Sequence, residues 1–342
     1  MRAENAFGYK IERSFKVKIT LSKIMKKILK ILLIILIVFI VLAVILAGFI
    51  YSKLNKINYV DIKKEDIEVN KGIEEKLSGY RNVAIFGIDT RNNTYSESRT
   101  DCIIIASINH DTKEIKLVSV YRDTYLNIPG YGLDKVNHAY SYGGPALSMS
   151  ALNTNLDLDI TEFVTVNFEA TKNIIDAVGG VKIKVTDAEA KSIPDISTGG
   201  TYLLNGKQAL AYGRIRKIDN DYARTERMRT VLMAVFEKAK TMSVTQLNKA
   251  VDELLPEVYT NINAKEILAL VPKIYSYSIV QSQGWPYETR GITLNGVWYG
   301  PPVNLEKNVS DLHKELFGEE NYVPTDKVKE ISNTIINKTG YR

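Results

Sequence analysis

The longest uninterrupted apolar stretch of this sequence lies near its N-terminus. Residues 31–51 (ILLIILIVFIVLAVILAGFIY) contain no charged side chain, and about 20 apolar residues suffice for a helix to cross the hydrocarbon core of a bilayer. The apolar region of a cleaved signal peptide is the competing interpretation, but such regions run for only about 7–15 residues and end at a small-residue cleavage site. The pattern therefore predicts one transmembrane helix over residues 31–51.

The chain after this segment changes from polar to strand-like near residue 80. Residues 52–79 are polar, rich in charge and weakly periodic, which predicts a stalk. Residues 83–88, 102–108 and 115–120 then form three short apolar runs of strand length. The polar residues 110–113 suit a hairpin turn between the second and third strands.

Helical and strand patterns alternate in the rest of the chain. Helices are predicted over 146–156 and 169–178, and strands over 162–167 and 181–186. A strand and turn are predicted over 291–302, and further helices over 206–213, 221–242 (with Asp221 as a candidate cap), 245–255, 264–272 and 325–337. We therefore expect an α/β domain over residues 80–342, with a mixed central sheet covered by helices on both faces.

Positive charge is concentrated ahead of the apolar segment. Residues 1–30 contain nine basic and two acidic residues, whereas the whole chain has a net charge of +6. By the positive-inside rule, the tail 1–30 stays in the cytoplasm and the domain 80–342 lies outside the cell. The rest of the chain is close to neutral. The positive net charge of the whole chain therefore reflects membrane topology and gives no indication of a nucleic-acid partner.

Cys102 is the only cysteine, so no intramolecular disulfide can form and the fold depends on its hydrophobic core. This residue lies within the second apolar run and is expected to be a buried strand residue without chemistry. One cysteine and three histidines also disfavour a zinc site of the usual type.

Acidic and arginine side chains gather at the ends of the predicted strands, where α/β sheets bind ligands. They lie after the first strand, before the second and after the third: Asp89, Arg91, Arg99, Asp101, Arg122 and Asp123. If the second and third strands form a hairpin centred on residues 111–112, positions whose numbers sum to 223 face each other, so Asp101 faces Arg122. That pair is either a plain cross-strand salt bridge or part of a site.

Two further arginine pairs follow. Arg214 and Arg216 lie on one side of an extended segment, and Arg224 and Arg227 share a face at the start of a predicted helix. A solvated charged surface is the plain interpretation of one such cluster. Several clusters together indicate an anion site, because guanidinium groups and helix N-termini both suit phosphate oxygens. The strand-end aspartates beside them suggest Mg²⁺ bridging a pyrophosphate.

An ordered series of motifs resembles one known family. The motifs cover about residues 80–235: 82–91 (NVAIFGIDTR), 99–101 (RTD), 120–123 (VYRD), 135–137 (KVN), 143–144 (GG), 176–181 (DAVGGV), 204–210 (LNGKQAL) and 214–216 (RIR). Each motif alone is weak, but the series in this order is specific. On these residues the chain resembles the LytR–CpsA–Psr family.

The resemblance implies a phosphotransferase of the bacterial cell envelope that uses Mg²⁺ or Mn²⁺. Such an enzyme moves a glycopolymer of the teichoic-acid or capsular-polysaccharide type from polyprenyl pyrophosphate to peptidoglycan, through a phosphodiester, and releases polyprenyl phosphate. The metal-binding aspartates of the family fall on Asp89 and Asp101. Its pyrophosphate-contacting arginines fall on Arg122, Arg214, Arg216 and Arg224, and the further candidates for substrate binding are Arg91, Arg99, Lys135, Asn137 and Arg227.

Two roles in this reaction stay open at the level of sequence. Asp123 and Asp221 are both candidates for the general base, although Asp221 could instead only cap its helix. The polyprenyl tail needs an apolar slot, and ordinary core packing is the favoured role for each of the candidates that could line one: Val164, Val166, Phe168, Ile174 and Ile175.

The chain departs from the family at two positions. Tyr121 stands where proline usually precedes the arginine, and Met228 stands where glutamine is common, so a hydrogen bond to the head group or acceptor is expected to be missing. A non-catalytic polyprenyl-pyrophosphate sensor and a pyrophosphatase-like hydrolase fit the anchor and the anion site as well. The aspartate pair favours the transferase over the sensor, because capture of pyrophosphate could use arginines alone.

Overall fold

The computed structural model describes residues 57–90, 98–216 and 218–341. The expected cytoplasmic tail 1–30, the transmembrane helix 31–51, the first five residues of the stalk and the candidate Arg91 lie outside the described residues. In the part that is described, no helix is long and apolar enough to span a membrane. The described residues form one compact unit.

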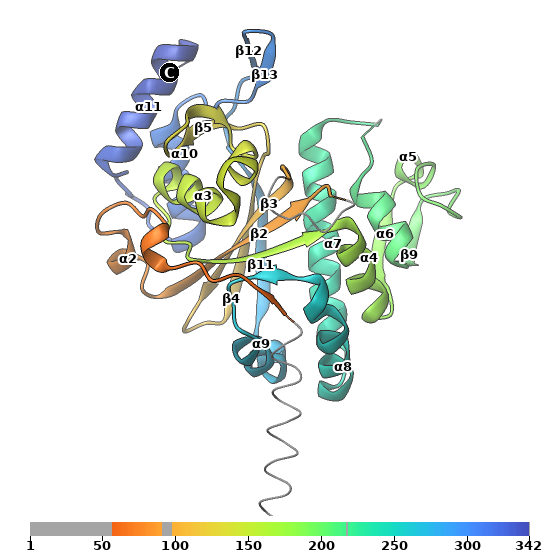
Figure 1. Ribbon diagram of the computed structural model, residues 1–342. Coiled ribbons are helices and arrows are strands. Elements are labelled where there is room, and N and C mark those ends of the chain that lie inside the picture. The colour runs from red at the N-terminus through yellow and green to blue at the C-terminus, as the bar shows by residue number, and fades with distance from the viewer. Residues whose placement is uncertain (1–56, 91–97, 217, 342) are drawn as a thin grey trace, which may run out of the picture. The chain divides into compact units, whose positions relative to one another are not determined.

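A seven-stranded mixed sheet forms the centre of this unit (Figure 1). Its strand order is β1 (Asn58–Tyr59), β10 (Tyr259–Thr260), β7 (Glu162–Asn167), β2 (Tyr80–Ile88), β3 (Thr100–Asn109), β4 (Glu114–Val120) and β11 (Ser278–Trp285). The pairs β10/β7, β2/β3 and β3/β4 are antiparallel, and the pairs β1/β10, β2/β7 and β4/β11 are parallel. The prediction of a mixed central sheet is therefore confirmed.

Helices cover both faces of the sheet, because alternate residues of each strand point to opposite sides. On one face, Phe86 and Ile105 join a core with α3 (His138–Leu156), α10 (Leu305–Phe317) and α11 (Asp326–Thr339). On the other face, Ile104 packs with Leu232 of α7 (Asp221–Lys240). The helices α4 (Phe168–Ala177) and α6 (Gly206–Gly213) lie on this second side, where α6 contacts both α4 and α7. The expected covering of both faces is confirmed.

The remaining described elements lie outside the central sheet. Three two-stranded sheets pair β5 (Tyr125–Ile128) with β6 (Gly132–Lys135), β8 (Val181–Val185) with β9 (Gly200–Leu204), and β12 (Ile292–Leu294) with β13 (Val297–Tyr299). The short helices are η1 (Lys64–Asp66), α2 (Ile73–Lys76), α5 (Asp187–Ala190), α8 (Val244–Leu254), η2 (Leu255–Glu257), α9 (Ala264–Leu270) and η3 (Val271–Ser276).

Residues 57–79 do not form the stalk that their polar composition predicts. Strand β1 pairs with β10 at the edge of the central sheet. Ile67, Ile73 and Leu77 are buried in the same core as Phe86. A few apolar side chains in a charged segment were enough to join it to the domain, and they are too sparse to give a periodic signal.

The β3–β4 hairpin has the register expected from the sequence. Ile104 pairs with Ser119 and Ile105 with Val118, so the numbers of paired residues do sum to 223. Two other segments differ from expectation. The helix expected from residue 146 begins at His138 and is kinked at Gly143 and Gly144.

The segment 291–302 also differs from expectation, because it is a hairpin instead of one strand. Asn295 and Gly296 both have positive φ at its turn, as a two-residue hairpin loop of the primed type requires. The Asn-Gly pair is the sequence signal for this turn.

Candidate functional site

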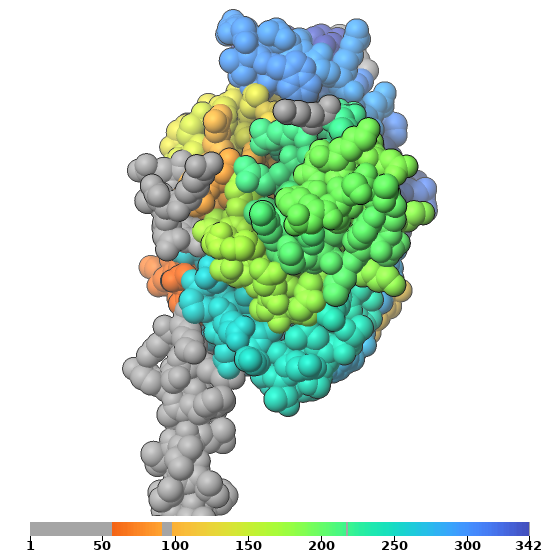
Figure 2. Space-filling view, turned by 90° about the vertical axis from the view of Figure 1, so that its right-hand side faces the viewer, coloured from red at the N-terminus to blue at the C-terminus, as the bar shows by residue number. Residues whose placement is uncertain are grey.

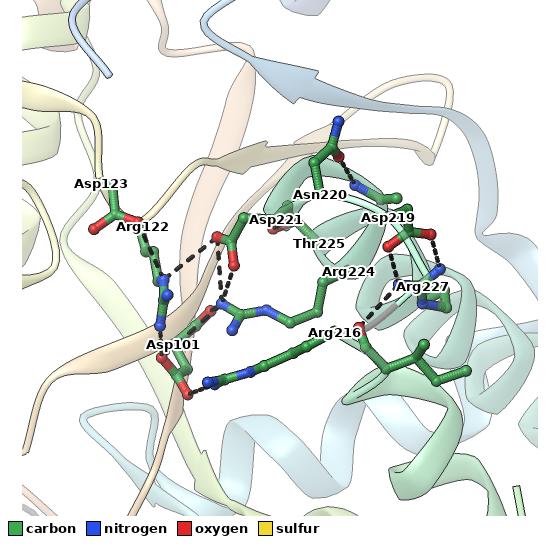
Figure 3. A network of polar contacts seen from close by, with 12 residues as sticks. Asp101, Arg122, Asp123, Arg216, Asp219, Asn220, Asp221, Arg224, Thr225 and Arg227 are labelled. Atoms are coloured by element: carbon green, nitrogen blue, oxygen red, sulfur yellow. Dashed lines mark hydrogen bonds and ion pairs between the residues drawn. The ribbon is translucent and has the colours of Figure 1, made fainter. Parts of the chain in front are cut away.

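Asp101 is the extra residue of a β-bulge. Strands β2 and β3 pair in register up to Gly87 and Cys102, and the next pair is Ile88 with Thr100, which leaves Asp101 without a partner on β2. A bulge bends its strand and can redirect a side chain. Here it leaves the Asp101 carboxylate at the centre of the polar network in Figure 3.

Three arginines from three separate segments meet at Asp101. Its Oδ1 atom lies 2.6 Å from Nη1 of Arg122, and its Oδ2 atom lies 3.4 Å from Nη2 of Arg216. Nη2 of Arg224 donates to the backbone carbonyl of Asp101 at 3.4 Å. The predicted pairing of Asp101 with Arg122 is thus confirmed, and it is part of a larger cluster and not an isolated cross-strand bridge.

Arg122 follows β4 and contacts three carboxylates. Besides Asp101, its Nε atom lies 3.4 Å from Oδ2 of Asp123 and 3.3 Å from Oδ2 of Asp221. Burial by itself would lower the pKa of Arg122, but the charges of Asp221, Asp123 and Asp101 and the hydrogen bond to Asp101 outweigh it and raise the pKa. The guanidinium group is therefore held in one place and stays charged.

The start of α7 differs from the sequence interpretation. Asn220 is the N-cap, because its side chain accepts a hydrogen bond from the backbone N–H of Ala223 at 3.0 Å. Asp221 is the first residue of the helix, and its Oδ1 atom lies 3.1 Å from Nη2 of Arg224. Asparagine is among the preferred cap residues, so Asp221 is released from that role and belongs to the arginine cluster.

Arg224 is the least satisfied cation of the cluster. Its side chain is 1% exposed, and its Nε and Nη1 atoms have no hydrogen-bond partner among the described residues. Burial lowers the pKa of Arg224, Asp221 acts against this, and the nearby charges of Arg122 and Arg216 lower the pKa further. A buried donor without a partner costs about 1–3 kcal/mol, so this group is suited to receive an anion.

Arg227 does not join Arg224, contrary to expectation. Its Nη1 and Nη2 atoms donate to the two carboxylate oxygens of Asp219 at 2.6 and 2.7 Å, and Nη2 also donates to the carbonyl of Ile215 at 2.9 Å. Positions three apart on a helix differ by about 60° in direction, and in Figure 3 Arg227 points away from Asp101. Arg227 holds the segment between α6 and α7 in place, and both of its terminal nitrogens are bonded within the protein.

The other predicted residues lie around this cluster. Nζ of Lys135 lies 2.8 Å from Oδ1 of Asp123. The backbone N–H of Asn137 donates to the carbonyl of Arg122 at 3.2 Å, while its buried side-chain Oδ1 has no partner among the described residues. Asp89 and Arg99 are exposed at the adjoining ends of β2 and β3.

An apolar cavity of about 400 Å³ opens beside the cluster, between the sheet and the helices α4, α6 and α7. Asp101 and Arg214 both line it, and the Arg214 guanidinium carbon lies 4.1 Å from the centre of the Phe168 ring. A second apolar cavity of about 540 Å³ adjoins it. The two cavities share six lining residues: Val83, Ile108, Val164, Ile174, Val235 and Val258.

The cavity corrects the preference for core packing at four of the five slot candidates, while Ile175 is buried in a hydrophobic core as expected. All five candidates for the apolar slot line the cavity: Val164, Val166, Phe168, Ile174 and Ile175. Of these, only Ile175 is fully buried. Cys102 and Met228 line it too. Met228 therefore contributes apolar surface to the cavity. Composition cannot distinguish a packed core from a lined cavity, because both need the same apolar side chains.

Comparison with known proteins places these observations in a family. The LytR_cpsA_psr family matches residues 44–315. The chain belongs to the LytR–CpsA–Psr family. Two of its relatives are polyisoprenyl-teichoic acid–peptidoglycan teichoic acid transferases. Bacillus subtilis TagT is 33% identical over 68% of this chain and 75% of its own length, and Oceanobacillus iheyensis TagU is 34% identical over 79% and 83%.

Solved structures of the LytR–CpsA–Psr family share the fold. A structure of the family protein YwtF (TagT) with bound octaprenyl pyrophosphate lipid is 27% identical to this chain, covers 70% of it and 90% of the solved chain, and has a TM-score of 0.56. TagT bound to LIIa-WTA is 29% identical, with a coverage of 71% and 91% and a TM-score of 0.60. The resemblance drawn from the motifs is thus confirmed.

Proposed function

We propose that this protein transfers a glycopolymer of the teichoic-acid or capsular-polysaccharide type from polyprenyl pyrophosphate to peptidoglycan. The observation that carries the proposal is the position of Arg224. It has two unfilled donors and contacts Asp101, which lines the apolar cavity together with Arg214. A pyrophosphate on an apolar tail fits both features, because its phosphate oxygens can accept from the arginine donors and its tail can fill the apolar cavity. The transferase names of its relatives and the octaprenyl pyrophosphate bound to one of them support the same function.

In this proposal the head group lies against Arg122, Arg216 and Arg224, and the tail occupies the cavity. Guanidinium groups form charge-assisted hydrogen bonds with phosphate oxygens, often as bidentate pairs. Each buried methylene of the tail contributes about 0.8 kcal/mol. The donor is thus held at both ends, which fixes the pyrophosphate relative to the acceptor.

The proposed reaction uses these positions. A hydroxyl oxygen of the acceptor sugar attacks the phosphorus nearer the glycopolymer and forms a new P–O bond. The P–O bond within the pyrophosphate breaks, and its electron pair leaves with polyprenyl phosphate. Phosphoryl transfer depends mainly on positioning and on neutralising charge, which are the roles of the three arginines. Asp123 and Asp221 flank Nε of Arg122 and are the two carboxylates proposed to receive the hydroxyl proton.

Asp89 and Asp101 are the proposed ligands of Mg²⁺ or Mn²⁺. They lie at adjoining strand ends, and Mg²⁺ is commonly bound by one or two carboxylates together with substrate phosphates and water. In the described part of the chain, no three acidic, histidine or cysteine side chains converge as a ligand set. The two carboxylates are the proposed protein ligands, and substrate phosphates and water would complete the coordination. When bound, the ion would supply positive charge to the phosphate oxygens.

The proposed cellular location and membrane topology follow from the sequence pattern. Residues 31–51 would anchor the chain, with the tail 1–30 in the cytoplasm and the domain outside the cell. A donor whose tail lies in the bilayer presents its pyrophosphate at the membrane surface. Removing residues 1–51 should therefore reduce activity on membrane-embedded donor far more than activity on a soluble short-chain donor, and equal losses would contradict an anchoring role.

The test is transfer of a labelled lipid-linked glycan to peptidoglycan by the full-length chain in detergent with Mg²⁺. Arg122→Ala and Asp101→Ala should abolish both transfer and release of polyprenyl phosphate. Lys307→Ala, which changes an exposed residue of α10, serves as the control. Unchanged turnover in Arg122→Ala would sink the assignment.

The products separate the rival functions. Release of polyprenyl phosphate without attached glycan would indicate a hydrolase. Stoichiometric donor binding without any product would indicate a sensor. Comparing Asp123→Asn with Asp221→Asn in the same assay identifies the base, because loss of the base should lower kcat without weakening donor binding.

A further inference from the structure

Three tyrosines lie on the turn between β5 and β6, on α3 and on β13. They are Tyr131, Tyr142 and Tyr299 and are called the tyrosine ledge below. Tyr131 is 58% exposed and Tyr142 is 41% exposed, and their rings are stacked with centroids 4.6 Å apart and an interplanar angle of 18°. Large aromatic side chains that stay exposed beside a site commonly mark an interaction surface.

Hydrogen bonds hold the ledge in position. The Tyr142 hydroxyl donates to Oδ2 of Asp134 at 2.7 Å, and the same oxygen lies 2.9 Å from Nδ1 of His138. The other oxygen of Asp134 accepts from the backbone N–H of Lys135 at 2.7 Å. The Tyr142 ring, on which Tyr131 stacks, is thus held before any ligand arrives, which lowers the entropy cost of binding to it.

Within the ledge, Tyr299 is the tyrosine that lies toward the proposed reaction centre. It lies on the hairpin β12–β13, which is fixed at Asp123 by a hydrogen bond from the backbone N–H of Gly300 to the Asp123 carbonyl at 2.9 Å. Nζ of Lys135 lies 5.7 Å from the Tyr299 ring centroid and 2.8 Å from Asp123. Figure 2 shows this blue segment at the top of the molecule, next to the yellow surface that includes β5, β6 and α3.

The ledge and the cavity lie on opposite sides of the arginine cluster. The contacts run in order from the cavity through Asp101, Arg122, Asp123 and Lys135 to Tyr299. The cavity is on the side of α4, α6 and α7, whereas Tyr142 lies on α3, which covers the other face of the sheet. In phosphoryl transfer the attacking and leaving oxygens are roughly in line through the phosphorus. A leaving group on the cavity side therefore requires an acceptor that approaches from the ledge.

We propose that the tyrosine ledge binds the sugar strand of the peptidoglycan acceptor and guides one of its hydroxyl groups to Asp123. Lys135 beside the ledge is paired with Asp123, and Asp134 lies 2.9 Å from Nδ1 of His138. No positive charge is left over among these residues for a polyphosphate. Tyrosine rings with hydroxyl groups suit a ligand with apolar C–H faces and many hydroxyls. The proposal rests on the proposed function and names the place where its acceptor binds.

The test uses a purified, uncrosslinked peptidoglycan tetrasaccharide and the full-length chain in detergent. The double variant Tyr131→Ala/Tyr142→Ala should weaken tetrasaccharide binding and raise the acceptor KM by roughly tenfold, since it removes a stacked aromatic pair. The kcat and the Kd for farnesyl pyrophosphate should not change. Tyr142→Phe keeps the ring and should retain most of the affinity. Tyr275→Ala removes a tyrosine of similar exposure on η3 and is the matched control.

The outcomes separate this inference from the proposed function. Direct binding of the tetrasaccharide is measured without donor, so a wild-type chain that shows no transfer still tests the ledge. Equal tetrasaccharide affinity in the wild type and a folded double variant would overturn the inference. An equal loss of farnesyl pyrophosphate affinity would also overturn it, because it would assign the ledge to the donor. If the double variant does not fold, Tyr131→Ala alone, which changes the most exposed ring, decides the question.

Discussion

Arg224 and Arg227 lie three residues apart on α7, and replacing each by methionine should have opposite consequences. Both side chains are almost fully buried. Arg227 is bonded to Asp219 and to the Ile215 carbonyl, whereas Arg224 has two unfilled donors. Arg227→Met should therefore cost stability, and Arg224→Met should cost donor binding.

The magnitudes follow from these contacts. Hydrogen bonds to charged groups contribute about 1.5–3 kcal/mol each, and partial exposure of Asp219 reduces this, so Arg227→Met should lower the free energy of unfolding by about 3 kcal/mol. For a domain of this size the Tm should fall by about 6–12 °C. In Arg224→Met, the loss of its contacts lowers the free energy of unfolding, and removing two unpaired buried donors raises it. The two effects should cancel to within about 1 kcal/mol. The loss of two phosphate contacts should weaken farnesyl pyrophosphate binding by about 100-fold.

Thermal unfolding by circular dichroism and calorimetric titration with farnesyl pyrophosphate measure the two effects on the full-length chain in detergent. Each variant is the control of the other, because the substitution, the helix and the burial are the same. A Tm of Arg224→Met as low as that of Arg227→Met, together with wild-type affinity for farnesyl pyrophosphate, would refute the reasoning.

Three further predictions concern the cavity, the core and one glycine. Val166→Phe fills part of the cavity and should weaken binding of octaprenyl pyrophosphate while leaving inorganic pyrophosphate unchanged in the same titration. Burial lowers the pKa of His313 to about 4, below 6.5 in the unfolded chain, so stability present above pH 6.5 should fall by about 3 kcal/mol toward pH 4. Unfolding curves should show a flatter pH dependence for His313→Gln. A Cβ at Gly206 would collide with the Lys172 carbonyl, so Gly206→Ala should cost about 2 kcal/mol in urea unfolding.

The sequence predicted the centre of the site because that part depends on local geometry. A short polar turn between two apolar runs determines the register of β3 and β4, and continuing that register past the paired residues brings Asp101 opposite Arg122. The arginines of the segments around 216 and 224 were recognised by their spacing and their motifs. Their meeting at Asp101 depends on how α7 packs on the sheet, which no local pattern encodes.

The parts that were missed depend on contacts between distant segments. Strand β1 has two residues and exists through its pairing with β10, about 200 positions away. The bulge at Asp101 shifts the register by one residue, and the glycine beside it, Gly87, lies on the partner strand and not at the extra residue itself. Arg227 points away from Arg224 because it is paired with Asp219. Residue spacing alone does not predict which arginine pairs with Asp219. The preference for core packing over a cavity failed for a different reason, since the empty volume is a property of the assembled helices.

The hydrogen bond from Gly300 to Asp123 has a consequence for the order of synthesis. It joins the C-terminal part of the chain to the loop that follows β4. The main core likewise contains both Ile73 and Ile335. A nascent chain that has reached only α7 carries every arginine of the cluster but lacks β11, the hairpin β12–β13 and the last two helices. On the proposed function, a prematurely terminated product would therefore lack the C-terminal elements needed to use the lipid-linked donor, and activity would begin only with the complete chain.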